Sequence, residues 1–382
     1  MSNASHSSIG VLPVRTRRDW KAFHALPARL RGDDPNWIPP LALQARQTWA
    51  PRHPYFRHAR ARAWLAVRGG DPVGRISAQV DELQAGAGRP GRGEFGQLEA
   101  IDDADVFRAL FDVACDWLRG ERRSEVAGPF DLSINQQCGL LVDGFDASPM
   151  MLMNHNPRYY AERVEALGFE PVAELLAYRG SPRYELADRI QRALDRLARR
   201  LTVRPLGRGD LAGSSETMRR LFNAAWARNW GFVPLTAEEF AHMVGEMKLL
   251  IRPGYVQLAY FDGTPAGFIV ALPDVNELIA DLGGRLFPTG AVRILWRLGR
   301  RRARRARIPL MGIEPGFQQS FRGAAIAYAL IEAVRRPLIA DGIELTEQSW
   351  ILADNRGMRA IVESIGMEVA QRFRIYRRRL TA

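Results

Sequence analysis

Two patterns of apolar residues alternate along this chain: short continuous apolar runs, and segments in which apolar residues stand three or four positions apart. Short continuous apolar runs are typical of buried strands, whereas apolar positions three or four residues apart predict helices. In the second half the pattern predicts strand, helix, strand, helix and strand at 310–313, 324–339, 343–352, 355–365 and 369–377. The first half gives the same order at 95–98, 105–119, 126–134, 157–167 and 173–178. This alternation predicts an α/β fold.

An internal repeat indicates that the two halves are copies of one fold. Residues 65–76 match residues 258–269 at a constant offset, sharing Leu, Ala, Gly, Pro, Gly and Ile. We therefore expect two α/β domains at 1–180 and 201–382, each with a mixed central sheet flanked by helices. Ser181 is expected to cap a connecting helix at 181–200. Shorter matches flank the central one in the same order, Val14-Arg15 with Val203-Arg204 and 165–169 with 363–367.

The matched segment has the pattern of a β-hairpin. Gly70 or Gly263 would supply the positive φ of the turn, and a proline two residues later resumes the strand. Gly74 and Gly267 then fall inside the second strand. A glycine there indicates a bulge or a close approach by another part of the protein or by a ligand.

Length and composition are those of a globular protein with two cores of ordinary size. The chain has 382 residues, 47% of them hydrophobic. It shows neither a signal-peptide pattern nor an apolar run long enough to span a membrane, so we expect a cytoplasmic protein. Cys115 and Cys138 form no CxxC pair and the six histidines are scattered, so the sequence indicates neither a disulfide framework nor a metal site.

The net charge of +12 suits an anionic partner, although codon usage is a strong alternative explanation for so marked a preference for arginine. Local clustering is more informative. Apolar residues including Phe287, Leu295 and Trp296 precede a dense run of arginines, a composition that suits an interfacial segment on an anionic membrane. Docking of an acidic acyl carrier protein, contact with coenzyme A phosphates, and a solvated arginine-rich helix are the alternatives. Nucleic acid is disfavoured because no reading module accompanies the charge. The arginines are Arg300, Arg301, Arg302, Arg304, Arg305 and Arg307.

The predicted helix 355–365 begins with Asp354-Asn355 and ends with Ile365-Gly366-Met367. With the order of elements before it, this segment resembles the closing motif of the GNAT acyltransferase superfamily, in which an Asn starts a helix and a Gly-Phe pair ends it. Bacterial ceramide synthases, GNAT-like acyltransferases of this size that act on long-chain amines, are a more distant resemblance. The chain also resembles a group of bacterial tandem GNAT-like proteins over nearly its whole length, most clearly at 33–40, 53–58, 138–145 and 349–355.

The resemblance implies a donor site along the strand that ends at Ile313 and in the turn that follows it. In the superfamily a turn of the form Gln/Arg-x-x-Gly-x-Gly/Ala holds the coenzyme A pyrophosphate, which a helix N-terminus favours through its unpaired amides and its dipole. Two registers fit, Gln318-x-x-Phe321-x-Gly323 and Arg322-x-x-Ala325-x-Ala327. Both lack the first glycine, which implies weak or altered coenzyme A binding or a carrier-protein donor. The predicted donor-binding residues are Ile313, Gln318, Gln319, Ser320, Phe321, Arg322, Gly323, Ala324 and Ala325.

The two halves differ at this turn. The corresponding segment of the first half, 95–103, is acidic where a diphosphate would lie. The resemblance therefore implies that the N-terminal GNAT-like domain is degenerate and that the C-terminal domain is the catalytic copy.

Acylation of an amine requires a base that takes a proton from the ammonium group and an acid that protonates the leaving thiolate. Glu347 and Glu314 are the candidate bases, directly or through water, with solvated carboxylates at a strand edge as an equal alternative. The tyrosine acid of the superfamily falls on Val362, which leaves Tyr328 as a substitute. Asn355 is expected to cap the last helix and completes the predicted catalytic set.

We therefore expect an N-acyltransferase that moves an acyl group from acyl-CoA, as a co-substrate, or from an acyl-carrier thioester to an amine such as a lipid-like long-chain amine. It would work in the cytoplasm, peripherally on the inner face of the membrane. The alternative is a non-catalytic tandem GNAT-like protein that binds a membrane or a partner. The sequence calls for neither a metal nor a permanently bound cofactor.

Overall fold

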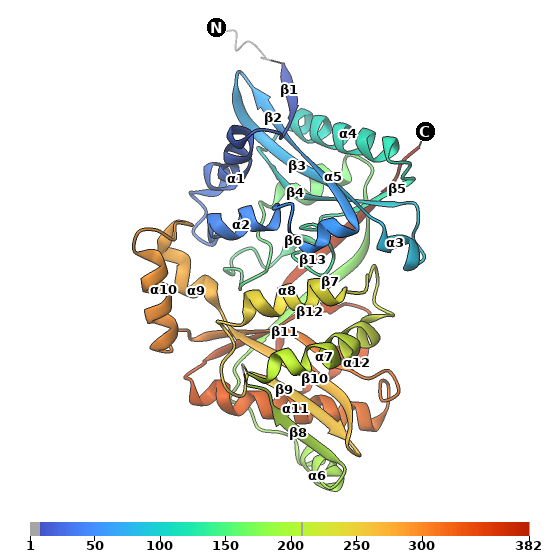
Figure 1. Cartoon of the computed structure of the whole chain (residues 1–382), viewed down its shortest axis with the longest axis vertical. Coiled ribbons are helices and arrows are strands. Elements are labelled where there is room, and N and C mark those ends of the chain that lie inside the picture. The colour runs from blue at the N-terminus through green and yellow to red at the C-terminus, as the bar shows by residue number, and fades with distance from the viewer. Residues whose placement is uncertain (1–7, 208, 382) are drawn as a thin grey trace. The chain divides into compact units, whose positions relative to one another are not determined.

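The structure is a computed structural model that describes residues 8–207 and 209–381. The chain divides into two compact units, each assembled from more than one stretch of sequence. The described part of unit 1 runs to Glu174 and also includes Gly283–Leu286 and the residues from Phe373 onward. Unit 2 contains Leu175–Leu282 and Phe287–Arg372. The elements of both units are labelled in Figure 1.

Unit 1 is a mixed sheet in the order β1-β2-β3-β4-β5-β13, in which β4 and β5 run parallel. Its core lies between this sheet and α4, whose apolar face packs against β3 (Figure 1). The strands are β1 (Ile9–Pro13), β2 (Ala59–Arg68), β3 (Asp71–Asp81), β4 (Arg92–Ala100), β5 (Glu125–Gly128), β6 (Leu140–Asp143) and the end of β13 (Glu368–Arg379). The helices are α1 (Arg17–Arg31), α2 (Ala42–Thr48), η1 (Pro54–Arg57), α3 (Leu83–Gly86), α4 (Ala104–Gly120) and α5 (Tyr159–Glu165).

Unit 2 repeats this arrangement in the order β8-β9-β10-β11-β12-β7, with β11 and β12 parallel. Helix α11 covers one face of its core, packed on β9 and β10 (Figure 1). The strands are β8 (Leu201–Pro205), β9 (Val256–Phe261), β10 (Thr264–Pro273), β11 (Arg305–Ile313), β12 (Leu345–Leu352) and the end of β7 (Glu170–Gly180). The helices are α6 (Asp188–Leu197), α7 (Asp210–Trp226), α8 (Ala237–Met247), α9 (Val275–Ile279), η2 (Ala280–Leu282), α10 (Gly290–Gly299), α11 (Phe321–Ala340) and α12 (Arg356–Ser364).

The sixth strand of each sheet comes from the other half of the sequence. In unit 1, β5 pairs with the end of β13, from Gly128 opposite Tyr376 to Glu125 opposite Arg379. In unit 2, β12 pairs with the end of β7 in the same antiparallel sense. The compact units therefore differ from the expected boundaries 1–180 and 201–382. A cut between these ranges would leave the edge of β5 without its partner, because the strand that completes it lies at the end of the chain.

The matched hairpins occupy equivalent places in the two sheets, as the repeat predicted. Gly70 and Gly263 both have a positive φ in the turn. Both hairpins carry a register shift at the same matched position, directly before Gly74 in one and Gly267 in the other. A Cβ atom on Gly74 would lie 2.8 Å from Leu110 Cδ1 of α4, and one on Gly267 would lie 2.8 Å from a backbone oxygen of β11. The structure thus confirms the bulge and the close approach.

Two predicted elements differ most from the structure. The strand expected at 126–134 ends at Gly128, because the chain then turns and runs beside β4. The connecting helix begins at Asp188, not at Ser181, whose hydroxyl instead accepts a hydrogen bond from the Arg183 backbone at 3.1 Å. The residues in between are not helical because they lie against the unit 2 core, with Tyr184 packed on it.

Candidate functional site

The two parallel strands of unit 2 separate part-way along their length. β11 and β12 pair from Arg305 opposite Leu345 to Ile308 opposite Gln348. Beyond that point the described residues show no further pairing between them. β11 continues beside β10, and β12 continues beside β7. The divergence exposes one edge of β11, whose residues from Pro309 to Met311 are only half-buried.

Two backbone N–H groups of β11 face this opening. The Glu314 amide donates to Ala266 O at 2.9 Å, so residue 314 faces β10. Successive residues of a strand direct their backbone groups to opposite edges, so Ile313 and Met311 face the opening. Their carbonyls confirm this orientation, since Trp226 Nε1 donates to Met311 O at 3.2 Å and the side chain of Gln318 donates to Ile313 O at 2.9 Å. The edge can therefore offer the Met311 and Ile313 amides to a carbonyl oxygen.

Glu347 lies at the closed end of the opening, and its side chain is fully buried. Arg179 Nε donates to Glu347 Oε2 at 2.8 Å, and Ser349 Oγ donates to Glu347 Oε1 at 2.6 Å. Arg307 is also buried and donates from Nε to Ser349 Oγ at 2.9 Å, with its Nε 3.8 Å from Glu347 Oε1. Its guanidinium lies over the Trp350 ring, 4.8 Å from the centroid. Glu347 is therefore a carboxylate within a buried charged network, so the alternative of a solvated carboxylate is wrong for it.

Sequence reasoning missed three partners of Glu347. The period of two along a strand places Ser349 on the same face as Glu347, so this contact could have been read from the sequence. Arg307 and Arg179 belong to β11 and β7, and only the sheet order brings them to β12. The sequence pattern had instead placed Arg307 among the membrane-facing arginines. That prediction is wrong, because the Arg307 side chain lies within the sheet and is 2% exposed.

Glu314 lies apart from this network, at the far end of β11. It is half-buried, and its carboxylate makes no hydrogen bond to another described residue. Glu314 thus stands where the donor turn begins, whereas Glu347 stands where the strands separate.

The turn into α11 is closed by the Gln318 side chain, which donates to Ala225 O at 3.1 Å as well as to Ile313 O. Ser320 caps the helix by accepting from the Gly323 amide at 3.1 Å. A Cβ on Gly323 would lie 2.1 Å from Phe317 O, so only glycine fits this position. The register that starts at Gln318 therefore spans the turn and the first turn of the helix.

The alternative register lies wholly inside α11. Ala325 and Ala327 are 3% and 0% exposed in the unit 2 core, so neither lines the turn. Arg322 is exposed, with its guanidinium 5.7 Å from the centroid of the Phe261 ring. Phe321, at the position of the missing glycine, is 60% exposed. No acidic residue lies in the first turn of α11, which leaves its N-terminus favourable to an anion.

Ala324 follows in the helix, and Gln319 is exposed with a positive φ.

The closing motif has the predicted cap. Asn355 Oδ1 accepts from the Met358 amide at 3.1 Å at the start of α12, and the residue is exposed. Its participation in catalysis stays a prediction. Val362 is fully buried, whereas Tyr328 is half-buried, with its hydroxyl 2.7 Å from Ser364 Oγ.

The equivalent opening in unit 1 is filled by the chain itself. β4 and β5 pair over three residues, and the chain after β5 then returns to β4. The Phe130 amide donates to Phe95 O at 2.8 Å, and Gln79 Nε2 donates to Phe130 O at 3.0 Å. A Cβ on Gly96 would lie 1.8 Å from Phe130 O, so this approach requires glycine. No acyl thioester fits along this part of β4 unless the segment around Phe130 moves.

The backbone groups that correspond to Ile313 are also occupied in unit 1. The Ile101 amide bonds to Val73 O as the Glu314 amide bonds to Ala266 O, which makes Ala100 the counterpart of Ile313. The Ala100 amide donates to the hydroxyl of Tyr160 at 2.8 Å, and the hydroxyl of Tyr159 donates to Ala100 O at 2.6 Å. Burial raises the pKa of the Tyr160 phenol well above its usual range, so this hydroxyl keeps its proton.

The helix that follows in unit 1 is capped by a carboxylate. Asp103 accepts from the backbone of Asp105 at 2.8 Å and forms an ion pair with Arg68 at 2.6 Å. The hydrogen bond from Arg68 is the main cause that lowers the pKa of Asp103, so the carboxyl is ionised at neutral pH. A negative charge already occupies the place where a diphosphate would bind, in contrast to the start of α11.

Comparison with known proteins identifies the family. Protein YghO of Escherichia coli (strain K12) is 41% identical over 372 residues, which are 96% of this chain and 95% of that protein. Bacterial ceramide synthase of Caulobacter vibrioides (strain NA1000 / CB15N) is 40% identical over 382 residues, with 99% of both chains covered. The chain belongs to the family of these two proteins. No protein-family model matches it.

Solved structures share the tandem arrangement. A tandem GNAT protein from the clavulanic acid biosynthesis pathway aligns with a TM-score of 0.57 at 15% identity, covering 98% of this chain and 99% of that one. A GCN5-related N-acetyltransferase from Sphaerobacter thermophilus aligns with a TM-score of 0.54 at 12% identity, covering 98% and 96%. At such low identity these structures show the fold. They confirm the predicted tandem GNAT fold, and with the family they confirm the acyltransferase class.

Within residues 8–207 and 209–381, no helix is both long and apolar enough to cross a membrane. Over the same ranges, no three or more His, Cys, Asp or Glu side chains are grouped to hold a metal ion.

Proposed function

We propose that unit 2 transfers an acyl group from acyl-CoA to the primary amine of a lipid-like long-chain amine. The observation that carries the proposal is the divergence of β11 and β12, which places the Met311 and Ile313 amides beside an opening that ends at Glu347. The relative from Caulobacter vibrioides named bacterial ceramide synthase supports the lipid-like acceptor, because a ceramide is the amide of a long-chain amino alcohol.

The donor would lie along β11 with its phosphates at the start of α11. The turn from Gln318 to Gly323 and the positive end of the helix dipole suit a diphosphate. The exposed Phe321 ring stands where the superfamily has glycine, so the diphosphate would lie farther from the backbone than it does over a glycine. A carrier-protein thioester presents the same pantetheine arm with less charge and is the second donor to test.

The reaction forms one C–N bond and breaks one C–S bond. The amine nitrogen attacks the thioester carbonyl carbon, and the Met311 and Ile313 amides would stabilise the negative charge that develops on the oxygen. The tetrahedral intermediate collapses with loss of the thiolate. The proton released by the amine would pass through the Ser349 hydroxyl to Glu347, and Glu347 would return a proton to the departing thiolate, directly or through water.

Unit 1 is proposed to have no donor site of its own. Its opening is filled around Phe130, the Ala100 amide is bonded to Tyr160, and Asp103 occupies the helix start. The first half of the sequence would still contribute the end of β7, which pairs with β12.

Purified full-length protein with hexadecanoyl-CoA and a long-chain 2-amino alcohol is expected to release free coenzyme A and an N-acyl product in equal amounts. Thiol release followed with a chromogenic disulfide, together with mass spectrometry of the lipid extract, checks both products. Turnover with neither hexadecanoyl-CoA nor an acyl carrier protein thioester would contradict the proposal. Release of thiol without amide would indicate hydrolysis instead of transfer.

We also propose that an apolar patch beside α10 brings the enzyme to an anionic membrane. Its residues Phe287, Val292, Leu295 and Trp296 are 75%, 69%, 59% and 51% exposed. This exposure of four large apolar side chains on and beside one short helix is what an interfacial segment requires.

The arginines near this patch divide into three groups. Arg300 and Arg302 are exposed and lie over the Trp296 ring, 5.7 and 5.4 Å from its centroid. Arg305 belongs to β11 and forms an ion pair with Asp274 at 2.7 Å, so the prediction that it faces a membrane is wrong, as it is for Arg307. The remaining two are exposed but paired with carboxylates, Arg301 with Asp341 at 2.6 Å and Arg304 with Glu344 at 3.6 Å.

Replacing Arg300 and Arg302 by glutamine is expected to weaken binding to anionic vesicles about 30-fold, since each arginine near such a surface contributes about 1 kcal/mol. Co-sedimentation with vesicles over a salt series measures this loss. The matched control replaces the exposed Arg192 and Arg196 of α6 by glutamine, which removes the same charge elsewhere in unit 2. Equal losses from both double variants, or equal binding to neutral vesicles, would contradict a specific membrane patch.

A further inference from the structure

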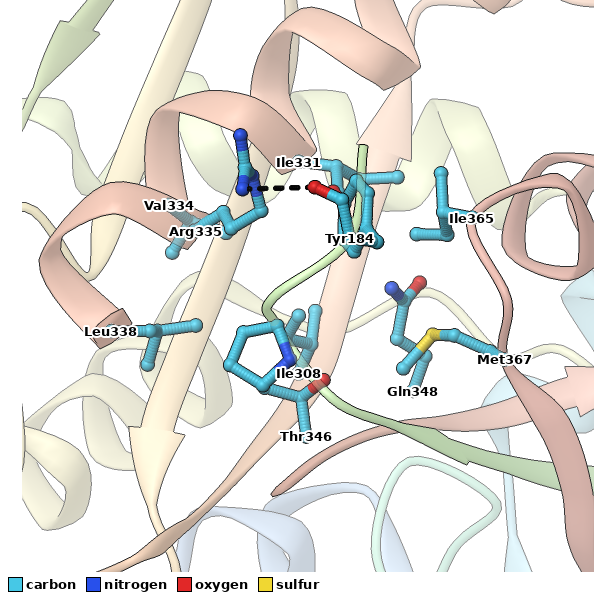
Figure 2. Close-up of a pocket in the computed structure, with 11 residues that line it drawn as sticks. Tyr184, Ile308, Ile331, Val334, Arg335, Leu338, Thr346, Gln348, Ile365 and Met367 are labelled. Atoms are coloured by element: carbon cyan, nitrogen blue, oxygen red, sulfur yellow. Dashed lines mark hydrogen bonds between the residues drawn. The ribbon is translucent and has the colours of Figure 1, made fainter. Parts of the chain in front are cut away.

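Unit 2 contains a shallow hollow on the α11 face of β11 and β12, where about 260 Å³ is free of protein atoms when the space open to solvent is included. Figure 2 shows it between α11, the two strands and the segment that carries Tyr184. Its walls are largely apolar, and Ile308, Ile331, Val334, Leu338, Ile365 and Met367 contribute most of them. Much of this space is open to solvent, so the enclosed part admits only one end of a ligand and not a whole nucleotide cofactor.

Two polar atoms within this largely apolar lining, Gln348 Oε1 and Arg335 Nε, have no hydrogen-bond partner among the described residues. Gln348 is 4% exposed, and no described residue hydrogen-bonds to its Oε1 atom. In Figure 2 its amide is directed into the space bounded by Tyr184, Ile365 and Met367. Thr346, which also lines the hollow, is by contrast satisfied by Gly180 O at 3.1 Å. A buried polar group without a partner is costly, so a bound group that donates a hydrogen bond to Gln348 Oε1 would be stabilised here.

The place of the hollow in the sheet links it to the donor site. Ile308 and Gln348 form the last pair before β11 and β12 separate, so the hollow begins where the opening closes. A donor with its phosphates at the start of α11 directs its acyl group toward this closed end. The acyl chain must leave there through one of the two faces of the sheet.

The two faces differ sharply in polarity. Glu347, Ser349 and Arg307 form the charged network on one face, and alternation along the strands places Ile308 and Gln348 on the other. An alkyl chain is stabilised only on the apolar face, because each methylene group buried there strengthens binding about fourfold. The amine would then approach from the charged face.

We propose that this hollow binds the beginning of a long acyl chain, and that Gln348 selects a chain with a hydroxyl group near the thioester. This inference rests on the proposed acyl transfer. A hydroxyl both donates and accepts, so it satisfies the Gln348 amide in either orientation. The chain enters beside Ile308 and runs along α11 past Ile331 and Val334. The substrate class is therefore a long-chain 2- or 3-hydroxyacyl thioester.

The first experiment blocks the hollow. Val334→Trp is expected to lower the ratio of kcat/KM for hexadecanoyl-CoA to that for acetyl-CoA at least tenfold in full-length protein. Ala340→Trp, at an exposed position of the same helix, should leave this ratio unchanged. Met367→Trp, on the opposite wall, provides a second obstruction if the first variant does not fold. Equal ratios in the wild type and in a folded wall variant would overturn the chain site.

The second experiment tests the hydroxyl. Wild-type protein is expected to favour 2- or 3-hydroxyhexadecanoyl-CoA over hexadecanoyl-CoA about tenfold in kcat/KM, and Gln348→Leu should abolish this preference. No preference in the wild type, or a preference that survives Gln348→Leu, would overturn the role of Gln348.

Binding separates this inference from the proposed function. Calorimetry compares hexadecanoyl-CoA with coenzyme A and requires no turnover. If the wild type acylates no amine but binds hexadecanoyl-CoA at least tenfold more tightly than coenzyme A, and Val334→Trp removes the difference, the chain site stands and the proposed transfer fails. Equal affinities for the two ligands would overturn the chain site whether or not transfer occurs.

Discussion

Glu347→Gln is expected to lower kcat/KM for amine acylation by about 10²–10⁴-fold, the usual contribution of a positioned general base. The substitution preserves the shape of the side chain but removes the charge that receives the proton through Ser349. Steady-state kinetics of coenzyme A release measures this loss.

Stability has to be measured alongside, because Glu347→Gln leaves Arg179 and Arg307 buried without their carboxylate. Removing one member of a buried ion pair costs about 3–5 kcal/mol, so rates are compared per folded molecule after thermal unfolding.

Unit 1 offers a matched control for this loss. Glu99 is 5% exposed and is held by Arg31, by Arg75 at 3.8 Å and by the Tyr160 hydroxyl at 3.1 Å. Glu99→Gln should destabilise the protein comparably and leave turnover per folded molecule near that of the wild type. The reverse result would place catalysis in unit 1. If Glu347→Gln keeps the full rate and Glu314→Gln loses activity, the general base is Glu314 at the end of β11.

Met311→Pro is expected to lower kcat about 10²–10³-fold, the cost of removing one donor that stabilises a developing oxyanion. Proline removes the Met311 N–H, which faces the opening and not β10. The ladder between β10 and β11 should therefore persist, because proline is tolerated where the missing N–H lies at the free edge of a strand. Single-turnover kinetics, with circular dichroism to monitor the fold, is the measurement.

Met311→Ala controls for the side chain, since it keeps the N–H and removes the thioether. It should retain most of the activity. An equal loss in Met311→Ala and Met311→Pro would show that packing, and not the amide, is responsible. Full activity in Met311→Pro would exclude this amide from the site.

Features that depend on neighbours in the sequence could be predicted well. The turn glycines Gly70 and Gly263 fix a local backbone conformation, so the two hairpins were recognisable from a short match. The cap formed by Asn355 joins atoms three residues apart, and it too was readable. The arginine run shows the limit of this approach. Its members are adjacent in sequence, yet Arg307 lies inside the sheet because strand β11 begins within the run.

The sequence by itself determined the order of elements, the duplication, the α/β class and the GNAT resemblance, because turn chemistry, caps and apolar periodicity are local properties of the chain. Only the tertiary structure decided which strand completes each sheet, since β7 and β13 carry no local signal that names a partner. It also decided the surroundings of Glu347, whose partner Arg179 lies 168 residues earlier. The filled opening of unit 1 likewise depends on a loop returning to β4, a contact that Gly96 permits but that no sequence pattern specifies.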